Sequence, residues 1–348
     1  MKRNEYGSDF HYDLDSKITL EPGRESLFIN NDFALFFSGR SALKALVSKG
    51  IEVEKWKKIF FPSYYCHEVV NFIRELPLEV DYYEYSPFLD ATDKVLDVSD
   101  QQGNVIVNVD FFGLKKLELA HYKAATIIDD LTHNITGFST STASYCFASL
   151  RKELPIPCGG YCYSPLGYEL PSGQFDVQSE EIAVKKLTAM YLKNLYLNGK
   201  FDSKDDFRNL FAEAEQEFST DKGNVALPKT SEAVLSLLSV EKILEAKHRN
   251  IQIALHELSS CEEIEFNLGT GKNNSLGLLL RFKNELQRNA CRDYLVAESI
   301  FPAVLWPHQK RERDILTEKL VLFIHLDYRY NKEQVDKIIG KIKLFLNT

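Results

Sequence analysis

A lysine and an aspartate lie twenty-two positions apart in this chain, each shortly after an apolar run typical of a β-strand. Asp130 follows Ala-Thr-Ile-Ile, and Lys152 follows Ser-Tyr-Cys-Phe-Ala and precedes Gly159-Gly160 by seven residues. A lysine amine condenses with an aldehyde, and a carboxylate keeps a pyridine nitrogen protonated so that the ring accepts electrons. We therefore expect the pair to hold pyridoxal 5'-phosphate (PLP), with Lys152 and Asp130 as the catalytic residues.

Each of these residues also has an ordinary structural explanation. Most lysines are solvated surface charges, and an aspartate at the end of a strand is often a helix cap or a turn residue. The surroundings favour a site, because Lys152 follows a strand and precedes a double glycine, with Pro155 and Pro157 breaking any helix between them. Asp129 would point to the opposite side of its strand from Asp130, so only one of the two can face a bound ring.

A phosphate site is expected earlier in the chain, at Ser38-Gly39-Arg40-Ser41. This run precedes an apolar-periodic helix, and the backbone N–H groups at a helix start bind phosphate. Gly39 allows close approach, Ser41 supplies a hydroxyl, and Arg40 adds a positive charge. An ordinary helix N-terminus has a similar composition, so the run is informative only together with the aspartate and the lysine.

Two further positions could contact the ring. Tyr65 and His67 follow the strand expected at 58–61, and either side chain could stack on a flat ring or simply pack in the core. His133 could contact the ring hydroxyl or close a turn. The sequence does not choose between these alternatives.

Composition excludes several classes of function. The chain has 348 residues, 44% of them hydrophobic and 26% charged, which suits a globular protein of two domains. A net charge of −8 without a dense basic cluster argues against a nucleic-acid partner. No apolar run reaches the length of a signal peptide core or a membrane span, and the six scattered cysteines form no metal-binding pattern. We expect a cytoplasmic enzyme without a metal site.

The order of the elements predicts an α/β fold. Strands and helices alternate through the first half, which indicates a mostly parallel sheet with helices on both faces, and ligands of such sheets bind where strands end. Long helices follow over 177–259, and a smaller α+β unit ends the chain, so we predict domains at 1–245 and 246–348. The expected strands are 58–61, 79–83, 104–109, 125–128, 144–148, 276–282, 301–306 and 320–326, and the expected helices include 66–75, 115–123, 185–197, 231–258, 284–294 and 332–346.

Six segments together resemble those of a known enzyme family. They are Gly39-Arg40-Ser41-Ala42-Leu43, Pro62-Ser63-Tyr64-Tyr65, Asn108-Val-Asp-Phe-Phe112-Gly113, Asp129-Asp130-Leu-Thr-His133, Lys152 with Gly159-Gly160, and Arg249-Asn250. The chain is similar to the DegT/DnrJ/StrS-type sugar aminotransferases, which are fold-type-I PLP enzymes. The resemblance implies a homodimer that moves an amino group, with glutamate as the probable donor, to a nucleotide-linked keto sugar in polysaccharide biosynthesis.

The sequence departs from that family at the phosphate contacts. The family carries a hydroxyl five residues before the lysine, where this chain has Phe147, and Ser149 stands three residues before it. The loop that reaches the partner's cofactor carries Asn and Arg in the family but Leu227-Pro228-Lys229 here, so the resemblance implies that Lys229 keeps the cation. Arg329 is either a carboxylate ligand or one half of a surface salt bridge. Two rival functions stay open: sugar dehydration or another elimination with the same cofactor, and a non-catalytic binding protein.

Overall fold

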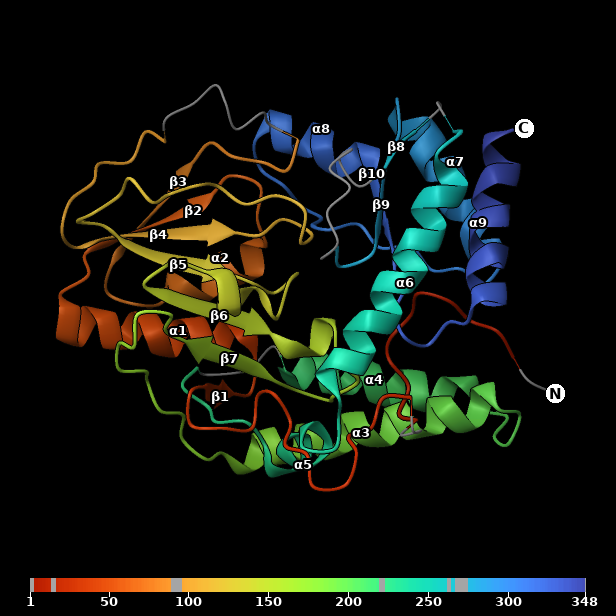
Figure 1. The fold of residues 1–348 in the computed structure, drawn as a ribbon, viewed down its shortest axis with the longest axis horizontal. Coiled ribbons are helices and arrows are strands. Elements are labelled where there is room, and N and C mark those ends of the chain that lie inside the picture. Colours follow the sequence, from red (N-terminus) through yellow and green to blue (C-terminus); the bar gives the residue numbers. More distant parts are fainter. Residues whose placement is uncertain are drawn as a thin grey trace.

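The protein is described here by a computed structural model covering residues 3–13, 17–88, 96–218, 223–261, 264–266 and 275–347. A seven-stranded sheet forms the larger part, and a three-stranded sheet forms the smaller part (Figure 1). The large sheet has the order β1-β7-β6-β5-β4-β2-β3, and the small one has the order β10-β9-β8. The strands are β1 Ala34–Phe36, β2 Lys58–Pro62, β3 Glu79–Tyr83, β4 Asn104–Val109, β5 Thr126–Asp130, β6 Tyr145–Ser149, β7 Gly160–Tyr163, β8 Glu265–Phe266, β9 Leu278–Arg281 and β10 Val321–Ile324.

The large sheet is parallel from β3 to β6 and antiparallel where β7 and β1 join it. All six residues of β4 are buried, which matches a strand covered on both faces. The predicted α/β class with a mostly parallel sheet is confirmed.

Helices cover the sheets and connect the two parts. They are α1 Gly39–Lys49, α2 His67–Ile73, α3 Val177–Leu197, α4 Lys204–Phe218, α5 Lys229–Leu235, α6 Val240–Leu258, α7 Glu285–Ala297, α8 Glu312–Leu320 and α9 Lys332–Leu346, with short helical turns at η1 Gly50–Glu54, η2 Gly137–Thr140 and η3 Leu150–Lys152. In Figure 1, α3 and α4 lie side by side below the large sheet, and α7 and α9 lie beside the small one.

Helix α6 belongs to both parts of the molecule. Its first turns place Val240 and Ile243 in an apolar cluster with residues of the large sheet, and its later turns place Ile251 and Leu258 in the cluster around β9 and α9. Figure 1 shows α6 crossing from the region of α3 to that of α7. The boundary expected at residue 245 falls inside this helix, and the division into two domains stays a prediction.

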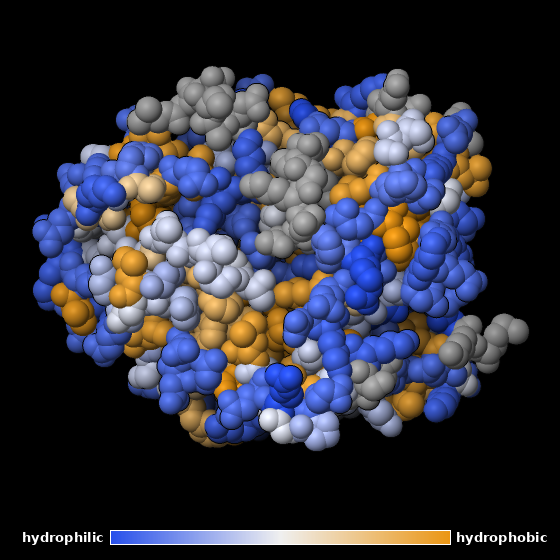
Figure 2. All heavy atoms as spheres, in the orientation of Figure 1, coloured by the Kyte–Doolittle hydropathy of each residue, from blue (hydrophilic) through white to orange (hydrophobic). Residues whose placement is uncertain are grey.

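The surface has mixed polarity. Figure 2 shows hydrophilic residues over much of one face, with hydrophobic residues in smaller groups between them. Among the helices of the described ranges, none combines enough length with enough apolar character to cross a bilayer.

Three of the predicted elements are wrong. Residues 115–123 form turns instead of a helix, because the Asn108 side chain binds both backbone groups of Leu117 and Lys116 pairs with Asp129. The helix expected over 231–258 is interrupted after α5 and starts again with Ser239 as the N-cap of α6. The strand expected at 301–306 is reduced to a single bridge between Ala303 and Phe323.

A buried ion pair fixes the chain that follows Lys152. The Glu153 carboxylate pairs with the Lys247 ammonium of α6, and these two side chains are 1% and 8% exposed, respectively. The other Glu153 oxygen accepts the backbone N–H of Ile135 at 3.2 Å. The pair therefore ties α6 to the loop that carries the lysine.

We expect Lys247→Met to lower the free energy of unfolding by about 3–5 kcal/mol, because it leaves the Glu153 carboxylate buried without its partner. Lys242→Met on the same helix is the control, since its pair with Glu21 lies at the surface, where water and salt screen the attraction. Urea unfolding of both variants measures the difference. Equal unfolding midpoints and slopes would contradict a structural role for the buried pair.

Candidate active site

Lys152 and Asp130 line the same cavity, at the ends of neighbouring strands. Asp130 is the last residue of β5, and β6 ends at Ser149, three residues before Lys152. The two strands are parallel and paired, so their carboxyl ends meet at one edge of the sheet. The cavity measures about 320 Å³. Its walls also include Ser38, Gly39, Arg40, Tyr65, Cys66, His67, Thr132, Ser149, Arg151, Phe218 and Trp306.

The Asp130 carboxylate is buried and receives two hydrogen bonds. The Tyr65 hydroxyl donates to its Oδ2 at 2.5 Å, and the backbone N–H of Thr132 donates to its Oδ1 at 2.9 Å. Burial raises the pKa of Asp130, and the hydrogen bonds from Thr132 and Tyr65 oppose this rise. Asp129 faces the other way and binds Lys116 and Ser141, as its place on the strand predicts.

The Lys152 side chain is half-buried, and its amine forms no hydrogen bond or ion pair with any residue in the described ranges. Burial lowers the pKa of Lys152, and the neighbouring Arg151 guanidinium lowers it further. A neutral amine is a nucleophile, so this environment favours the form that reacts with an aldehyde.

The first turn of α1 lies against the strand that leads to Lys152. A Cβ at Gly39 would come within 2.9 Å of the Cβ of Ser149, and a Cβ at Gly160 would come within 2.4 Å of the Ser38 carbonyl carbon. The second glycine of the double-glycine motif is therefore required by close packing between β7 and α1. Gly39, Arg40 and Ser149 all line the cavity, as a phosphate site at a helix N-terminus requires.

Ser41 and Arg40 are already bonded within the chain. The Ser41 backbone N–H donates to the Ser38 hydroxyl at 3.0 Å, and the two hydroxyls lie 2.6 Å apart, while Ser41 itself is not among the cavity walls. The Arg40 guanidinium donates to the carbonyl of Phe218 and lies over the rings of Phe72 and Phe218. Helix α4 therefore reaches the end of the cavity near the start of α1 through its last residue.

Both candidate stacking residues, Tyr65 and His67, line the cavity. His67 begins α2, and neither ring nitrogen has a partner among the described residues. A third aromatic side chain, Trp306, also lines the cavity, and its ring centroid lies 5.6 Å from that of Tyr65. Its segment is held against the large part of the molecule, because Tyr64 donates to the Leu305 carbonyl at 2.5 Å.

His133 lies behind the cavity wall. Its ring is nearly parallel to those of Phe112 and Trp306, with centroids 5.4 and 5.1 Å away, and it is not among the residues that line the cavity. Its Nδ1 accepts the backbone N–H of Phe112 at 3.2 Å. Burial, and then the charge of Lys152, lower the pKa of His133 to about 3.

Two other expected site residues lie elsewhere. Lys229 begins α5 at the surface, where its side chain is 76% exposed and pairs with Glu232. A contact with a partner's cofactor stays a prediction. Arg329 forms a buried pair with Asp327, with both side chains at most 6% exposed, so the alternative of a surface salt bridge is wrong.

Arg151 and Cys66 line the cavity although neither was singled out from the sequence. Both adjoin residues that were singled out, and their position after strand ends was the available signal.

The chain resembles solved aminotransferases in structure. No family model and no curated protein matches its sequence. Helicobacter pylori PseC, an aminotransferase involved in the biosynthesis of pseudoaminic acid, is 13% identical over 99% of this chain and 100% of its own, with a TM-score of 0.64. NtdA from Bacillus subtilis, solved with bound cofactor PMP, is 11% identical over 91% and 73% of the two chains, with a TM-score of 0.60. A DegT DnrJ EryC1 StrS aminotransferase from Brucella abortus is 15% identical over 91% and 86%, with a TM-score of 0.56.

The chain has the fold of these aminotransferases. At identities of this size the likeness establishes the arrangement of the backbone, and the chemistry must be argued from the residues themselves. Among the described residues, no cluster of three or more His, Cys, Asp or Glu side chains could hold a metal ion.

The depressed pKa of His133 gives a prediction about acid stability. The unfolded chain binds a proton at an ordinary histidine pKa of about 6.5, whereas the folded chain binds it only near pH 3, so stability falls as pH drops through this window. We expect the change from pH 7 to pH 5 to cost about 2 kcal/mol through His133 alone.

His133→Asn keeps an acceptor for the Phe112 N–H and removes the titrating ring, so its stability should depend less on pH than that of the wild type. His256→Asn is the control, because the His256 side chain is 87% exposed. Urea unfolding at the two pH values measures the effect. An unchanged pH dependence in His133→Asn would refute the assignment.

Proposed function

We propose that this chain is a PLP-dependent aminotransferase that moves an amino group, with glutamate as donor, to a nucleotide-linked keto sugar. The observation that supports it most directly is one cavity with a half-buried amine on one wall and a buried carboxylate on another. The residues fit the cofactor, because Gly39, Arg40 and Ser149 line this cavity at the start of α1, where backbone N–H groups receive a phosphate. The fold shared with PseC and NtdA agrees with this assignment.

Bound PLP would supply an aldehyde for amine exchange and a ring that withdraws electrons. Lys152 would hold the aldehyde carbon until the donor amine replaces it, and its freed amine would then carry a proton to and from the donor carbon. Its lowered pKa makes this transfer possible near neutral pH. Asp130 would hold the proton on the ring nitrogen, and its burial strengthens that attraction.

Other chain residues would hold the ends of the cofactor. Gly39, Arg40 and Ser149 would receive the phosphate, and Tyr65 would fix the Asp130 carboxylate through its hydroxyl. The proposal includes a homodimer in which the exposed Lys229 contacts the phosphate of the partner's cofactor. It also includes a location in the cytoplasm. The intact pair of Lys152 and Asp130 favours transamination over elimination or a binding role.

The purified protein should be yellow, and borohydride should remove its visible absorption band. Lys152→Ala should be colourless and release no 2-oxoglutarate from glutamate, because it lacks the amine that binds the aldehyde. Asp130→Asn should stay coloured and lose roughly 10²-fold or more in rate. Lys332→Ala, an exposed change on α9, should behave as the wild type. A wild type that cannot be reconstituted with PLP would refute the proposal.

Trp306 offers a measurement of cofactor binding that needs no turnover. The chain has two tryptophans, and Trp306 lines the cavity while Trp56 is buried elsewhere, against Gly50. Since PLP absorbs where indole emits, its binding should quench Trp306 strongly. Trp56 does not line the cavity, so Trp56→Phe should show a larger fractional quenching than Trp306→Phe. A larger fractional quenching in Trp306→Phe would show that PLP binds outside this cavity.

A further inference from the structure

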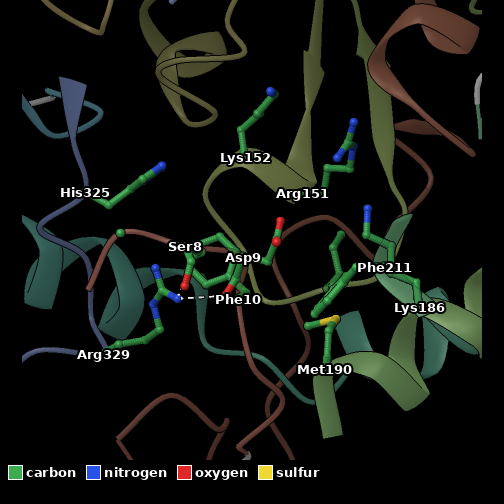
Figure 3. A pocket seen from close by; sticks show the side chains of 12 residues that line it. Ser8, Asp9, Phe10, Arg151, Lys152, Lys186, Met190, Phe211, His325 and Arg329 are labelled. Carbon is green, nitrogen blue, oxygen red and sulfur yellow. Dashed lines mark hydrogen bonds between the residues drawn. The ribbon is translucent and has the colours of Figure 1, made fainter. Parts of the chain in front are cut away.

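A second cavity adjoins the first at Arg151 and Lys152. It measures about 180 Å³, and these two residues line both it and the larger cavity that contains Asp130. Its remaining walls come from the N-terminal segment 7–10, from Ile156, from α3 and α4, and from the chain after β10 (Figure 3). Lys152 therefore belongs to the wall of both cavities.

The second cavity is lined by three cations, one carboxylate and the Lys152 amine. The cations are Arg151, Lys186 and Arg329, and the carboxylate is that of Asp9. Of these, Arg329 is fully engaged, because two of its nitrogens bind Asp327 at 2.8 and 2.7 Å and a third binds the carbonyls of Ser8 and Asp9.

Arg151 and Lys186 are not neutralised in the same way. Both pair with one carboxylate, that of Glu215 on α4, and Arg151 does so at 3.1 Å. The Arg151 and Lys186 charges lower the pKa of Glu215 to about 2. Glu215 carries one negative charge against two positive ones, and the Asp9 carboxylate supplies the balance. An anionic ligand that displaced Asp9 would therefore meet two cations beside Lys152.

We propose that this second cavity binds the α-carboxylate of the amino donor, through Arg151 and Lys186. The inference rests on the proposed function and deepens it by naming the donor's binding site. Connectivity identifies the anion: in an amino acid, the carboxylate is bonded to the carbon that carries the reacting amine, so it must lie next to Lys152. In a nucleotide sugar, several bonds separate the reacting carbon from the phosphates.

The size and the apolar walls of the cavity agree with a small amino acid. Its volume is below the about 300–1,000 Å³ of pockets for larger ligands, which excludes a whole nucleotide. Ile156, Met190 and Phe211 offer apolar contacts for a short carbon chain.

The N-terminal segment would compete with the donor. In Figure 3, the Asp9 carboxylate points toward the side of the cavity where Lys152 and Arg151 lie. Lys193 and Arg329 hold the segment in place through the Ser8 hydroxyl and the carbonyls of Ser8 and Asp9. Removing the Asp9 charge should therefore strengthen the binding of an anion.

The test measures the affinity of the PLP-loaded protein for glutarate, a dicarboxylate without an amine, by calorimetry. Arg151→Gln and Lys186→Gln should each weaken binding about tenfold or more. Asp9→Asn should tighten binding, a gain that misfolding cannot produce. Lys332→Gln on α9 is the charge-matched control and should leave affinity unchanged. Melting temperatures verify that each variant is folded.

Uridine diphosphate is the second probe. If it binds in competition with glutarate and loses affinity in the same variants, the cavity serves the nucleotide and the proposal is wrong. The proposal is also wrong if Arg151→Gln, Lys186→Gln and Asp9→Asn all leave the affinity for glutarate unchanged. The glutamate half-reaction distinguishes the proposed donor site from the proposed function. If it proceeds with an unchanged KM in Arg151→Gln and Lys186→Gln, the donor site is wrong and the aminotransferase function is still supported. If the wild type shows no half-reaction but binds glutarate with the expected effects of the variants, the proposed aminotransferase function is wrong and the carboxylate-binding site is still supported.

Discussion

The partial burial of Lys152 is the constraint on which the rest of the site depends. Taking a charged group out of water is costly, and the Arg151 guanidinium adds to that cost, so both lower the pKa of Lys152, while Cys66 and Glu215 oppose this only in part. Asp130 is buried too, but Tyr65 and Thr132 satisfy its oxygens. The carboxylate is therefore held by hydrogen bonds while the amine has none among the described residues, which is the asymmetry that the proposed function requires.

Close backbone packing maintains this arrangement. Gly160 of β7 leaves no space for a side chain against Ser38, so the start of α1 is pressed onto the strands that lead to Lys152. On the other side, the buried Glu153–Lys247 pair ties the residue after Lys152 to α6. Because α6 also packs against β9 and α9, the position of the lysine is coupled to the packing of the smaller part of the molecule.

The sequence was sufficient where local order determines position. Asp130 and Lys152 follow adjacent parallel strands, so their meeting at one sheet edge could be predicted from the strand pattern alone. The failures have long-range causes. Residues 115–123 lose their helix to the side chain of Asn108, and the 301–306 segment packs on the large sheet through hydrogen bonds that span more than 240 positions, from Tyr64 to Leu305 and from Gln309 to Tyr65. Periodicity carries no information about such contacts.

The two cavities share Arg151 and Lys152, so a group bound in either one changes the electric field at the Lys152 amine. In the proposed reaction, the Asp130 carboxylate would attract the ring nitrogen of the cofactor, and Arg151 and Lys186 would attract the carboxylate of the donor. An anion bound beside Lys152 would raise the pKa of its amine, and a cation would lower it. A lysine on the open surface would be screened from both by water and salt. The shared wall would therefore let a change of ligand shift the balance between the neutral and the protonated amine.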